Sequence, residues 1–194
     1  MSPRPSTAHL RRPAILTAAA EVISERGVQN TRISDVAERA GTSPPGVLYW
    51  FPTKDELLAE ALQFADERFY AGLTEELAEL GSARERLGRL VELWPADGDG
   101  ETVLWMELWV RALRDPRVAA TRERLDRRWR DALADIIREG QASGEFGPAD
   151  ADDVALLLGA VMDGFAIQLA LGDPAVTADV VKRHCLELAE ARLR

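Results

Sequence analysis

TRISDVAERAGTSPPGVLYWFPTKDELL, residues 31–58, is the stretch of sequence that decides the fold. Its first part predicts an amphipathic helix, because apolar residues recur at helical spacing, at Ile33, Val36, Ala37 and Ala40. Gly41 comes directly after them and can take the left-handed backbone conformation that closes a helix. This part of the chain therefore predicts a short helix followed by a tight turn.

A second helix is expected directly after the turn. Ser43 is a suitable N-cap, and Pro44 fits a first helical turn, where its missing N–H costs no hydrogen bond. This helix is expected to run from about Pro44 to Phe51, and the capping-box pattern from Thr53 to Glu56 starts a longer helix behind it. Two helices joined by about four residues form a helix-turn-helix, whose second helix enters the major groove of DNA.

Three stretches together resemble the N-terminal domain of tetracycline-repressor-like (TetR) transcriptional regulators. They are IxxVAxxAGTS at 33–43, YWFxxKDELL at 49–58 and, for the family's first helix, ILxAAxxxIxxxG at 15–27. The resemblance covers about the first third of the chain. It implies an all-α homodimer with a DNA-binding helix-turn-helix domain and arm at 1–54, and a helical effector-binding and dimerisation domain at 55–194.

The rest of the chain reads as helices separated by turn residues. They are expected at about 54–80, 83–94, 101–114, 118–139, 154–171 and 176–193. The polar loop at 95–100 contains a fragment, Asp97-Gly98-Asp99-Gly100, that superficially resembles a calcium loop. Because the remaining ligand positions are absent, we interpret it as a linker and expect no metal.

Charge is distributed unevenly along the chain. The formal net charge of −9 by itself opposes binding to nucleic acid. Residues 1–54, however, carry seven basic and four acidic side chains, whereas the remainder carries 17 basic and 29 acidic ones. Binding to duplex DNA depends on local charge, so the positive part can approach phosphate while the acidic part is repelled. An accidental asymmetry is the alternative, and the adjacent helix-turn-helix favours the first interpretation.

The segment expected to read bases lacks the usual base-reading side chains. Residues 42–50 contain no Arg, Lys, Asn or Gln, the residues that most often make bidentate contacts with bases. We expect weaker groups to act instead, through hydrogen bonds from Thr42 and Ser43, apolar contacts with thymine methyl groups from Pro44 and Pro45, and close backbone approach at Gly46.

Phosphate contacts follow from the family resemblance. Tyr49 and Lys54 match family positions that contact phosphate, and Thr31 is a further candidate at the N-terminus of the preceding helix. Leu48 replaces the first of the usual aromatic residues, which shifts the phosphate role to Tyr49 and Trp50. Pro45 stands where the family often has glycine. Three residues of this segment are expected in the core instead, namely Val47, Leu48 and Phe51.

The first 13 residues look like a mobile arm. Arg4, Arg11 and Arg12 could enter a minor groove or stay solvated, and the sequence leaves both open.

Four of the five tryptophans lie in the second domain: Trp94, Trp105, Trp109 and Trp129. They can be core residues or the walls of a pocket. WxxLW at 105–109, WRxxL at 129–133, the Gly-Glu-Phe turn at 144–146 and Asp163-Gly164 resemble the C-terminal domain of the betaine-aldehyde-pathway repressor-like (BetI-type) subgroup. The expected ligand-pocket residues are Trp105, Trp109, Trp129, Met162, Asp163 and Phe165.

The chemistry of the expected ligand is open between two classes. Aromatic faces with Glu107 or Asp163 could hold a cation, and the same walls would also suit a flat apolar or aromatic ligand.

Val154 to Leu171 contains a single charge, Asp163, and approaches membrane-spanning length. Its shortness, its polar and glycine residues and its lack of basic flanks argue against a membrane helix. A helix that is apolar on nearly all sides is otherwise buried on both sides. We therefore expect this helix and the last one to form a four-helix bundle with their symmetry mates in a homodimer.

An enzyme is not expected, because the sequence has two histidines and no hydrolase, P-loop, metalloprotease or dinucleotide fingerprint. No cofactor is expected either. Adjacent His184 and Cys185 do not face each other on a helix, as a nucleophile and its base must. The single cysteine excludes an intramolecular disulfide and fits a reducing cytoplasm. A helical adaptor would explain the acidic body but not the positive helix-turn-helix.

The sequence thus predicts a cytoplasmic repressor that binds a palindromic operator as a dimer. A small-molecule effector of unknown identity is expected to enter the body, shift the helix at 54–80 and move the two DNA-binding heads out of register. Activation in place of repression stays open.

Overall fold

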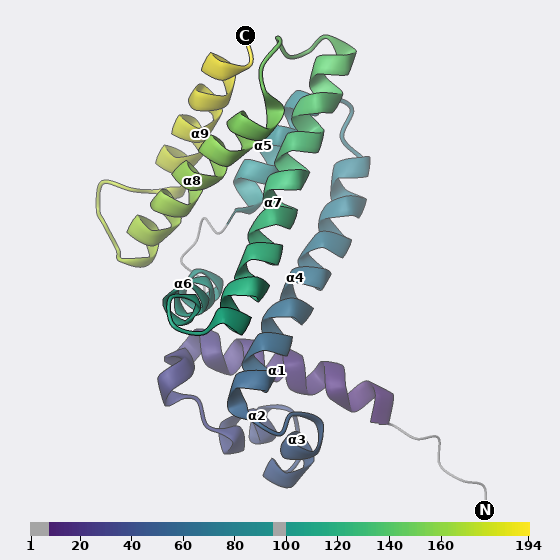
Figure 1. The fold of residues 1–194 in the computed structure, drawn as a ribbon, viewed down its shortest axis with the longest axis vertical. Helices are drawn as coiled ribbons and strands as arrows, with labels where there is room; N and C mark the ends of the chain where they lie inside the picture. Colours follow the sequence, from purple (N-terminus) through teal and green to yellow (C-terminus); the bar gives the residue numbers. More distant parts are fainter. Residues whose placement is uncertain (1–7, 95–99) are drawn as a thin grey trace, which may run out of the picture.

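The computed structural model describes residues 8–94 and 100–194, and within these ranges every regular element is an α-helix (Figure 1). The helices are α1 (Ala8–Asn30), α2 (Ile33–Arg39), α3 (Pro44–Trp50), α4 (Lys54–Ala78), α5 (Ala83–Leu93), α6 (Gly100–Ala112), α7 (Pro116–Ser143), α8 (Ala151–Ala170) and α9 (Ala178–Arg192). The predicted all-α class is confirmed. The predicted linker lies mostly outside the described residues.

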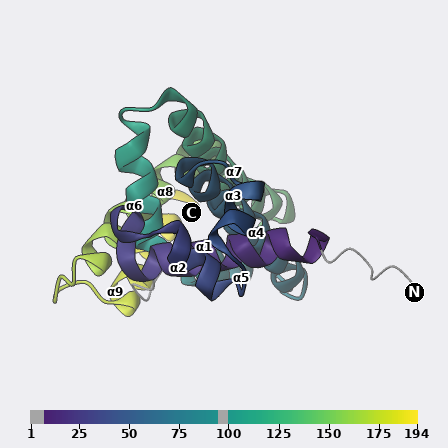
Figure 2. The ribbon, with the colours of Figure 1, turned by 90° about the horizontal axis from the view of Figure 1, so that it is seen from below.

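Helices α1–α3 form a small head at one end of the molecule, and the C-terminus lies at the opposite end (Figure 1). Seen from the head end, α1 crosses beneath the body with α2 and α3 close by (Figure 2). The apolar sides of these helices meet in a core that contains Val36, Val47 and Phe51, each 0% exposed.

The predicted turn and helix starts of the head are confirmed. Gly41 has a φ of +62°, which favours glycine over any residue with a Cβ. The Ser43 hydroxyl accepts a hydrogen bond from the Gly46 N–H at the start of α3, and the Thr53 hydroxyl accepts one from the Glu56 N–H at the start of α4. These local contacts fix where each helix begins.

The N-terminal arm is shorter than expected, because residues 8–13 belong to α1. Arg12 forms an ion pair with Glu60 of α4, and its guanidinium lies 5.5 Å from the centre of the Phe51 ring. These contacts hold the start of α1 against the head, so Arg12 does not belong to a freely solvated arm, which was one of the two alternatives. Arg4 lies outside the described residues.

Helix α4 runs from the head through the body, and α7 lies alongside it (Figure 1). Helices α5, α8 and α9 complete the body around a second core. The head's core does not end at the expected boundary after residue 54. It continues into α4, α6 and α7 through Leu62, Leu108 and Leu125, which are 2–3% exposed. Head and body therefore share buried apolar packing.

Helix α7 continues past the break expected at Gly140 and ends at Gly144, which has a φ of +77°. Gly140 serves packing instead, because a Cβ at this position would lie 2.1 Å from Cδ2 of Phe146. The turn at 144–146 folds the Phe146 ring back onto the helix.

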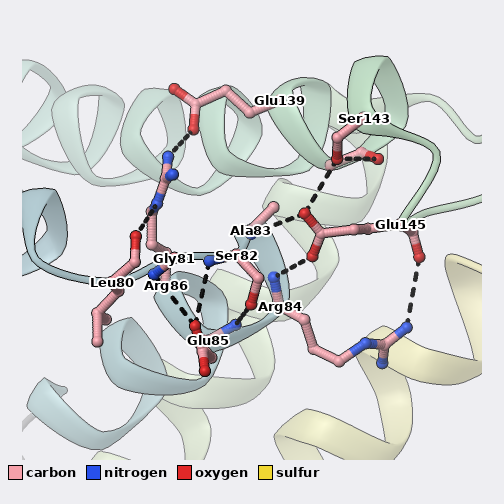
Figure 3. Close-up of polar contacts among 11 residues, drawn as sticks. Leu80, Gly81, Ser82, Ala83, Arg84, Glu85, Arg86, Glu139, Ser143 and Glu145 are labelled. Atoms are coloured by element: carbon pink, nitrogen blue, oxygen red, sulfur yellow. Dashed lines mark hydrogen bonds and ion pairs between the residues drawn. The ribbon is translucent and has the colours of Figure 1, made fainter.

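Glu145, in the same turn, fixes the start of α5 (Figure 3). Its carboxylate oxygens accept hydrogen bonds of 3.1 Å from the N–H groups of Ala83 and Arg84, which lowers the pKa of the carboxyl group. Ser82 and Glu85 add a capping box at the same helix end. The Gly-Glu-Phe turn at the end of α7 therefore holds the start of α5 through hydrogen bonds.

Helix α8 is long and apolar enough, by length and composition, to cross a membrane, and it is the one such helix in the described ranges. It packs against α7 and α9, as a core helix does, but only 33% of its residues are buried. Several of its apolar side chains are only half-buried, and Leu156 is 52% exposed in the single chain.

Substitution Gly140→Ala should lower the stability of the protein by about 1–3 kcal/mol, because the added methyl group overlaps the Phe146 ring. The matched control is Gly72→Ala in α4, where a Cβ meets nothing within 4 Å and alanine should stabilise the helix by about 0.4–1 kcal/mol. Thermal unfolding followed by circular dichroism measures both. Equal effects at the two positions would contradict the packing role of Gly140.

Candidate functional site

Helix α3 presents an apolar and aromatic surface to solvent. Tyr49 is 79% exposed and Leu48 is 44% exposed, and Pro44 and Pro45 are exposed beside them. The prediction that Leu48 belongs to the core is wrong. In this short helix Val47 takes the inward side, so its neighbour Leu48 points outward.

Two hydroxyl groups lie at the N-terminal end of α3. Thr42 Oγ1 lies 2.7 Å from the place that a Cβ on Gly46 would occupy, so glycine gives the room for this hydroxyl. The Ser43 hydroxyl accepts the capping hydrogen bond and keeps its own proton to donate. The end of α3 that would enter a major groove thus offers hydroxyl groups and backbone N–H groups.

Several arginines of the head are held in ion pairs. Arg39 contacts Glu25 at 2.8 Å and Glu21 at 3.0 Å, and these contacts raise the arginine's pKa. Within the part of the chain that the structure describes, Lys54 and Arg32 make no ion pair. Both are thus available to DNA phosphate. Arg32 was not predicted, although its position directly before α2 is a signal for such a role.

Thr31 and Trp50 are less accessible than their expected roles require. Thr31 is 4% exposed, and its hydroxyl donates a 2.8 Å hydrogen bond to the Gly27 carbonyl oxygen. We therefore correct its assignment from phosphate contact to support of the bend between α1 and α2. Trp50 is half-buried against the head core and meets the Tyr49 ring edge-on at 5.3 Å.

A cavity of about 220 Å³ lies in the body between α4, α6, α7 and α8. Its aromatic lining includes four tryptophans, and the rings of Trp94 and Trp129 lie 4.5 Å apart. Trp105 and Trp109 come from α6. Pockets for drug-sized ligands measure about 300–1,000 Å³, so this cavity suits a smaller molecule.

Three carboxylates line the same cavity: Asp66, Asp126 and Asp163. Burial raises the pKa of each. For Asp163 the pKa rises to about 6, with a smaller contribution from the negative charge of Asp126, and no ion pair involving Asp163 is present among the described residues. Aromatic faces beside a carboxylate form an arrangement that binds organic cations.

The structure places some of the expected pocket residues in the cavity wall and others elsewhere. Trp105, Trp109, Trp129 and Asp163 lie in the cavity wall. Met162 does not line the cavity, because it is 0% exposed in the body core.

Phe165 and Glu107 also fall outside the cavity lining. The Phe165 ring stacks on His184 of α9, with 6.0 Å between ring centres. Glu107 faces the head, where its Oε1 lies 3.7 Å from the position of a Cβ on Gly27.

Two carboxylates of the cavity, Asp66 and Asp126, were not predicted, and Trp94, which the sequence left open between core and pocket wall, also lines the cavity. A signal existed for Asp66, because it falls at helical spacing between Leu62 and Tyr70 on the inward side of α4. Arg128 pairs with Asp66 at 2.7 Å and lies 3.9 Å from the centre of the Tyr70 ring.

Helices α8 and α9 carry the residues expected at a dimer interface. On α9, Val181, Cys185 and Ala189 face the body core, and burial raises the pKa of the Cys185 thiol to about 11. His184 is exposed and Leu188 is half-buried on another side of the helix. The predicted dimer interface is therefore restricted to the side of α9 that does not pack against the core of its own chain.

Two family profiles match this chain. One, described as bacterial regulatory proteins of the tetR family, matches residues 15–61, and the other, described as the C-terminal domain of BetI-type transcriptional repressors, matches residues 83–194. Among curated proteins, the HTH-type transcriptional regulator PksA of Bacillus subtilis is 27% identical over 192 residues, with 93% of this chain and 89% of PksA covered.

Solved structures with the same fold include two transcriptional regulators. A transcriptional regulator from Saccharomonospora viridis in complex with choline is 34% identical, with a TM-score of 0.86 over 95% of this chain and 98% of that one. A TetR-family regulator from Rhodococcus sp. is 29% identical, with a TM-score of 0.79 over 95% and 98%.

Binding of an organic cation in the cavity should depend on pH through Asp163. Burial and the negative charge of Asp126 raise its pKa to about 6, against the opposing effect of Arg122 and Arg130, so this carboxyl group is ionised at neutral pH and becomes neutral below about pH 6. Affinity for tetramethylammonium should stay constant near pH 7 and fall as the pH drops below about 6, by about tenfold per unit at most. Quenching of tryptophan fluorescence measures it.

The variant Asp163→Asn should lose this pH dependence together with most of the affinity. Asp153→Asn, on the exposed side of the same helix, is the matched control and should behave like the native protein. An unchanged pH profile in Asp163→Asn would remove Asp163 from the binding site.

Proposed function

Because this chain belongs to the TetR family of transcriptional regulators, we propose that it binds a palindromic operator as a homodimer and releases it when an organic cation occupies the cavity. Repression is the proposed outcome of operator binding, and the cytoplasm is the proposed compartment. The observation that carries the proposal is one molecule with both a solvent-facing recognition helix and an aromatic, acidic cavity.

The proposed contacts with DNA come from three groups of residues. Thr42, Ser43, Pro44, Pro45 and Gly46 form the end of α3 that enters the groove. Leu48 adds an exposed apolar side chain suited to thymine methyl groups. Tyr49 and Lys54, with Arg32, are proposed to contact phosphate, which fixes the orientation of the head without reading sequence.

The proposed effector is a small quaternary ammonium compound. The related regulator from S. viridis binds choline, and the cavity here has the aromatic faces and the unpaired carboxylate that suit such a cation. The cavity volume of about 220 Å³ fits a ligand of this small size.

The link between cavity and head is short. Leu62, Trp105 and Leu125 line the cavity and also pack in the core of the head. On the same helix as Trp105, Arg111 forms a 2.6 Å ion pair with Asp55, next to Lys54 at the start of α4. We propose that the bound cation shifts α6 and α4 together and changes the spacing of the two heads. A differential affinity of a few kcal/mol suffices to release DNA.

Dimerisation is proposed through α8 and α9. The helix is strongly apolar, yet in the single chain only a third of its most apolar stretch is fully buried and Leu156 is 52% exposed. A second copy that covers this surface would remove apolar area from water, which is favourable. It would also bring two heads into a two-fold symmetric arrangement that matches a palindromic operator.

Lys54→Ala should weaken binding to all DNA sequences alike. Each dimer would lose two phosphate contacts, which reduces the slope of log affinity against log salt by about 2. Lys182→Ala is the matched control, because Lys182 pairs with Glu92 in the body. Footprinting and fluorescence anisotropy with DNA from the region upstream of the protein's own gene measure the binding site and the affinity of both variants. An unchanged salt slope in Lys54→Ala would mean that the head is placed wrongly on the duplex.

Arg111→Ala should weaken the response to effector. Loss of the ion pair with Asp55 removes one connection between α6 and the head, so the ratio of operator affinities without and with saturating choline should fall about two- to fivefold, the size expected for one surface ion pair. Arg114→Ala, exposed just beyond the same helix, is the control and should keep the native ratio. An unaltered ratio in both variants would exclude this ion pair from signalling.

A further inference from the structure

Two charged side chains in the cavity lining have no ion-pair partner in the part of the chain that the structure describes: Asp163 and Arg130. The other two carboxylates are already paired, at 2.7 Å for Asp66 with Arg128 and at 2.5 Å for Asp126 with Arg122. Counting only the described residues, the cavity therefore offers one uncompensated negative charge and one uncompensated positive charge.

These two charges are close but not in contact. Arg130 lies near enough to lower the pKa of both Asp163 and Asp126, yet it forms no ion pair within 4.0 Å with either. Arg130 comes from α7 and Asp163 from α8, and both border the same space. A small molecule can therefore lie between them.

The charge balance of the site distinguishes a simple cation from a zwitterion. With Asp163 ionised, the three carboxylates are balanced by Arg122, Arg128 and Arg130. A simple cation would pair with Asp163 and leave the Arg130 guanidinium half-buried without a counter-charge, which is costly in a low-dielectric site. A ligand with both charges would pair with both side chains and keep the site neutral.

Hydrogen-bond donors in the wall favour the same ligand. The indole N–H groups of Trp94, Trp109 and Trp129 are buried and have no acceptor within the described residues. Trp129 is only 7% exposed. Its Cδ1, the ring atom bonded to the indole nitrogen, lies 3.9 Å from the position that a Cβ on Gly159 would occupy. Buried donors without acceptors are destabilising, and a carboxylate would bring acceptor oxygens into the space that these residues line.

We propose that the effector is a small zwitterion, with an ammonium group held by Asp163 and the tryptophan faces and a carboxylate held by Arg130. The inference rests on the proposed function, because it assigns a ligand class to the same cavity. Arg130 is then the residue by which the site distinguishes an ammonium carboxylate from a simple ammonium ion, because a guanidinium can donate two parallel hydrogen bonds to a carboxylate.

The test compares three probes on the full-length protein: N,N,N-trimethylglycine, choline and tetramethylammonium. Isothermal titration calorimetry gives their affinities, and release of operator DNA gives their effect. Trimethylglycine should bind at least about tenfold more tightly than tetramethylammonium, the ratio expected for one charge-assisted hydrogen-bonded pair.

The variant Arg130→Gln should abolish that preference while it binds tetramethylammonium as well as the native protein does, or better, since a repelling charge is gone. The matched control Arg127→Gln, whose side chain pairs with Glu123 on the surface of the same helix, should keep the preference. Thermal unfolding and operator binding without ligand establish that both variants are folded.

Two results would overturn the inference. One is equal binding of trimethylglycine and tetramethylammonium by the native protein, and the other is a preference that survives in Arg130→Gln. If choline alone releases the operator, the zwitterion is wrong and the proposed function stands. If no ammonium compound binds, the proposed effector class fails together with the inference, whereas operator binding is judged by the footprint.

Discussion

The arrangement of this protein depends on apolar packing between the head and the body. Leu62, Trp105 and Leu125 are shared between the core of the head and the wall of the cavity. Close-packed interiors do not deform gradually, so a change on one side of these residues forces an adjustment on the other. The head and the cavity are therefore neighbours in one packed unit, and their coupling needs no long chain of intermediate contacts.

The turn and the helix starts of the head are fixed by contacts between residues close in sequence, which is why the sequence predicted them well. Gly41, Ser43 and Thr53 close or start helices through their own backbone conformation or hydroxyl group, and each of these signals is visible without tertiary structure. Leu48 was misjudged because α3 is too short for its period to be read reliably, and only packing shows that Val47 takes the inward side. The early start of α1 was missed because it depends on Arg12 and its distant partner Glu60.

The cavity was harder to predict, because its residues come from helices that are distant in sequence. The tryptophans were recognised as candidates. In the sequence Asp126 looks like an ordinary surface residue, and only the fold brings it close to Asp163. Met162 illustrates the opposite error, since it is adjacent to Asp163 in sequence but turns about 100° away on α8 and enters the core. Proximity in sequence is thus a poor guide to which side chains of a helix share a cavity.

Helix α8 explains why a strongly apolar segment can belong to a DNA-binding protein. One side of it, with Leu158 and Met162, fills the core of the body, and a second side, with Gly159 and Asp163, borders the cavity. Leu156 also borders the cavity, yet it is 52% exposed in the single chain. In the proposed dimer, a partner that covers the apolar surface of α8 would also reduce solvent access at this edge of the cavity. The proposed dimer contact and the proposed effector site would then share one helix, because α8 supplies residues to both.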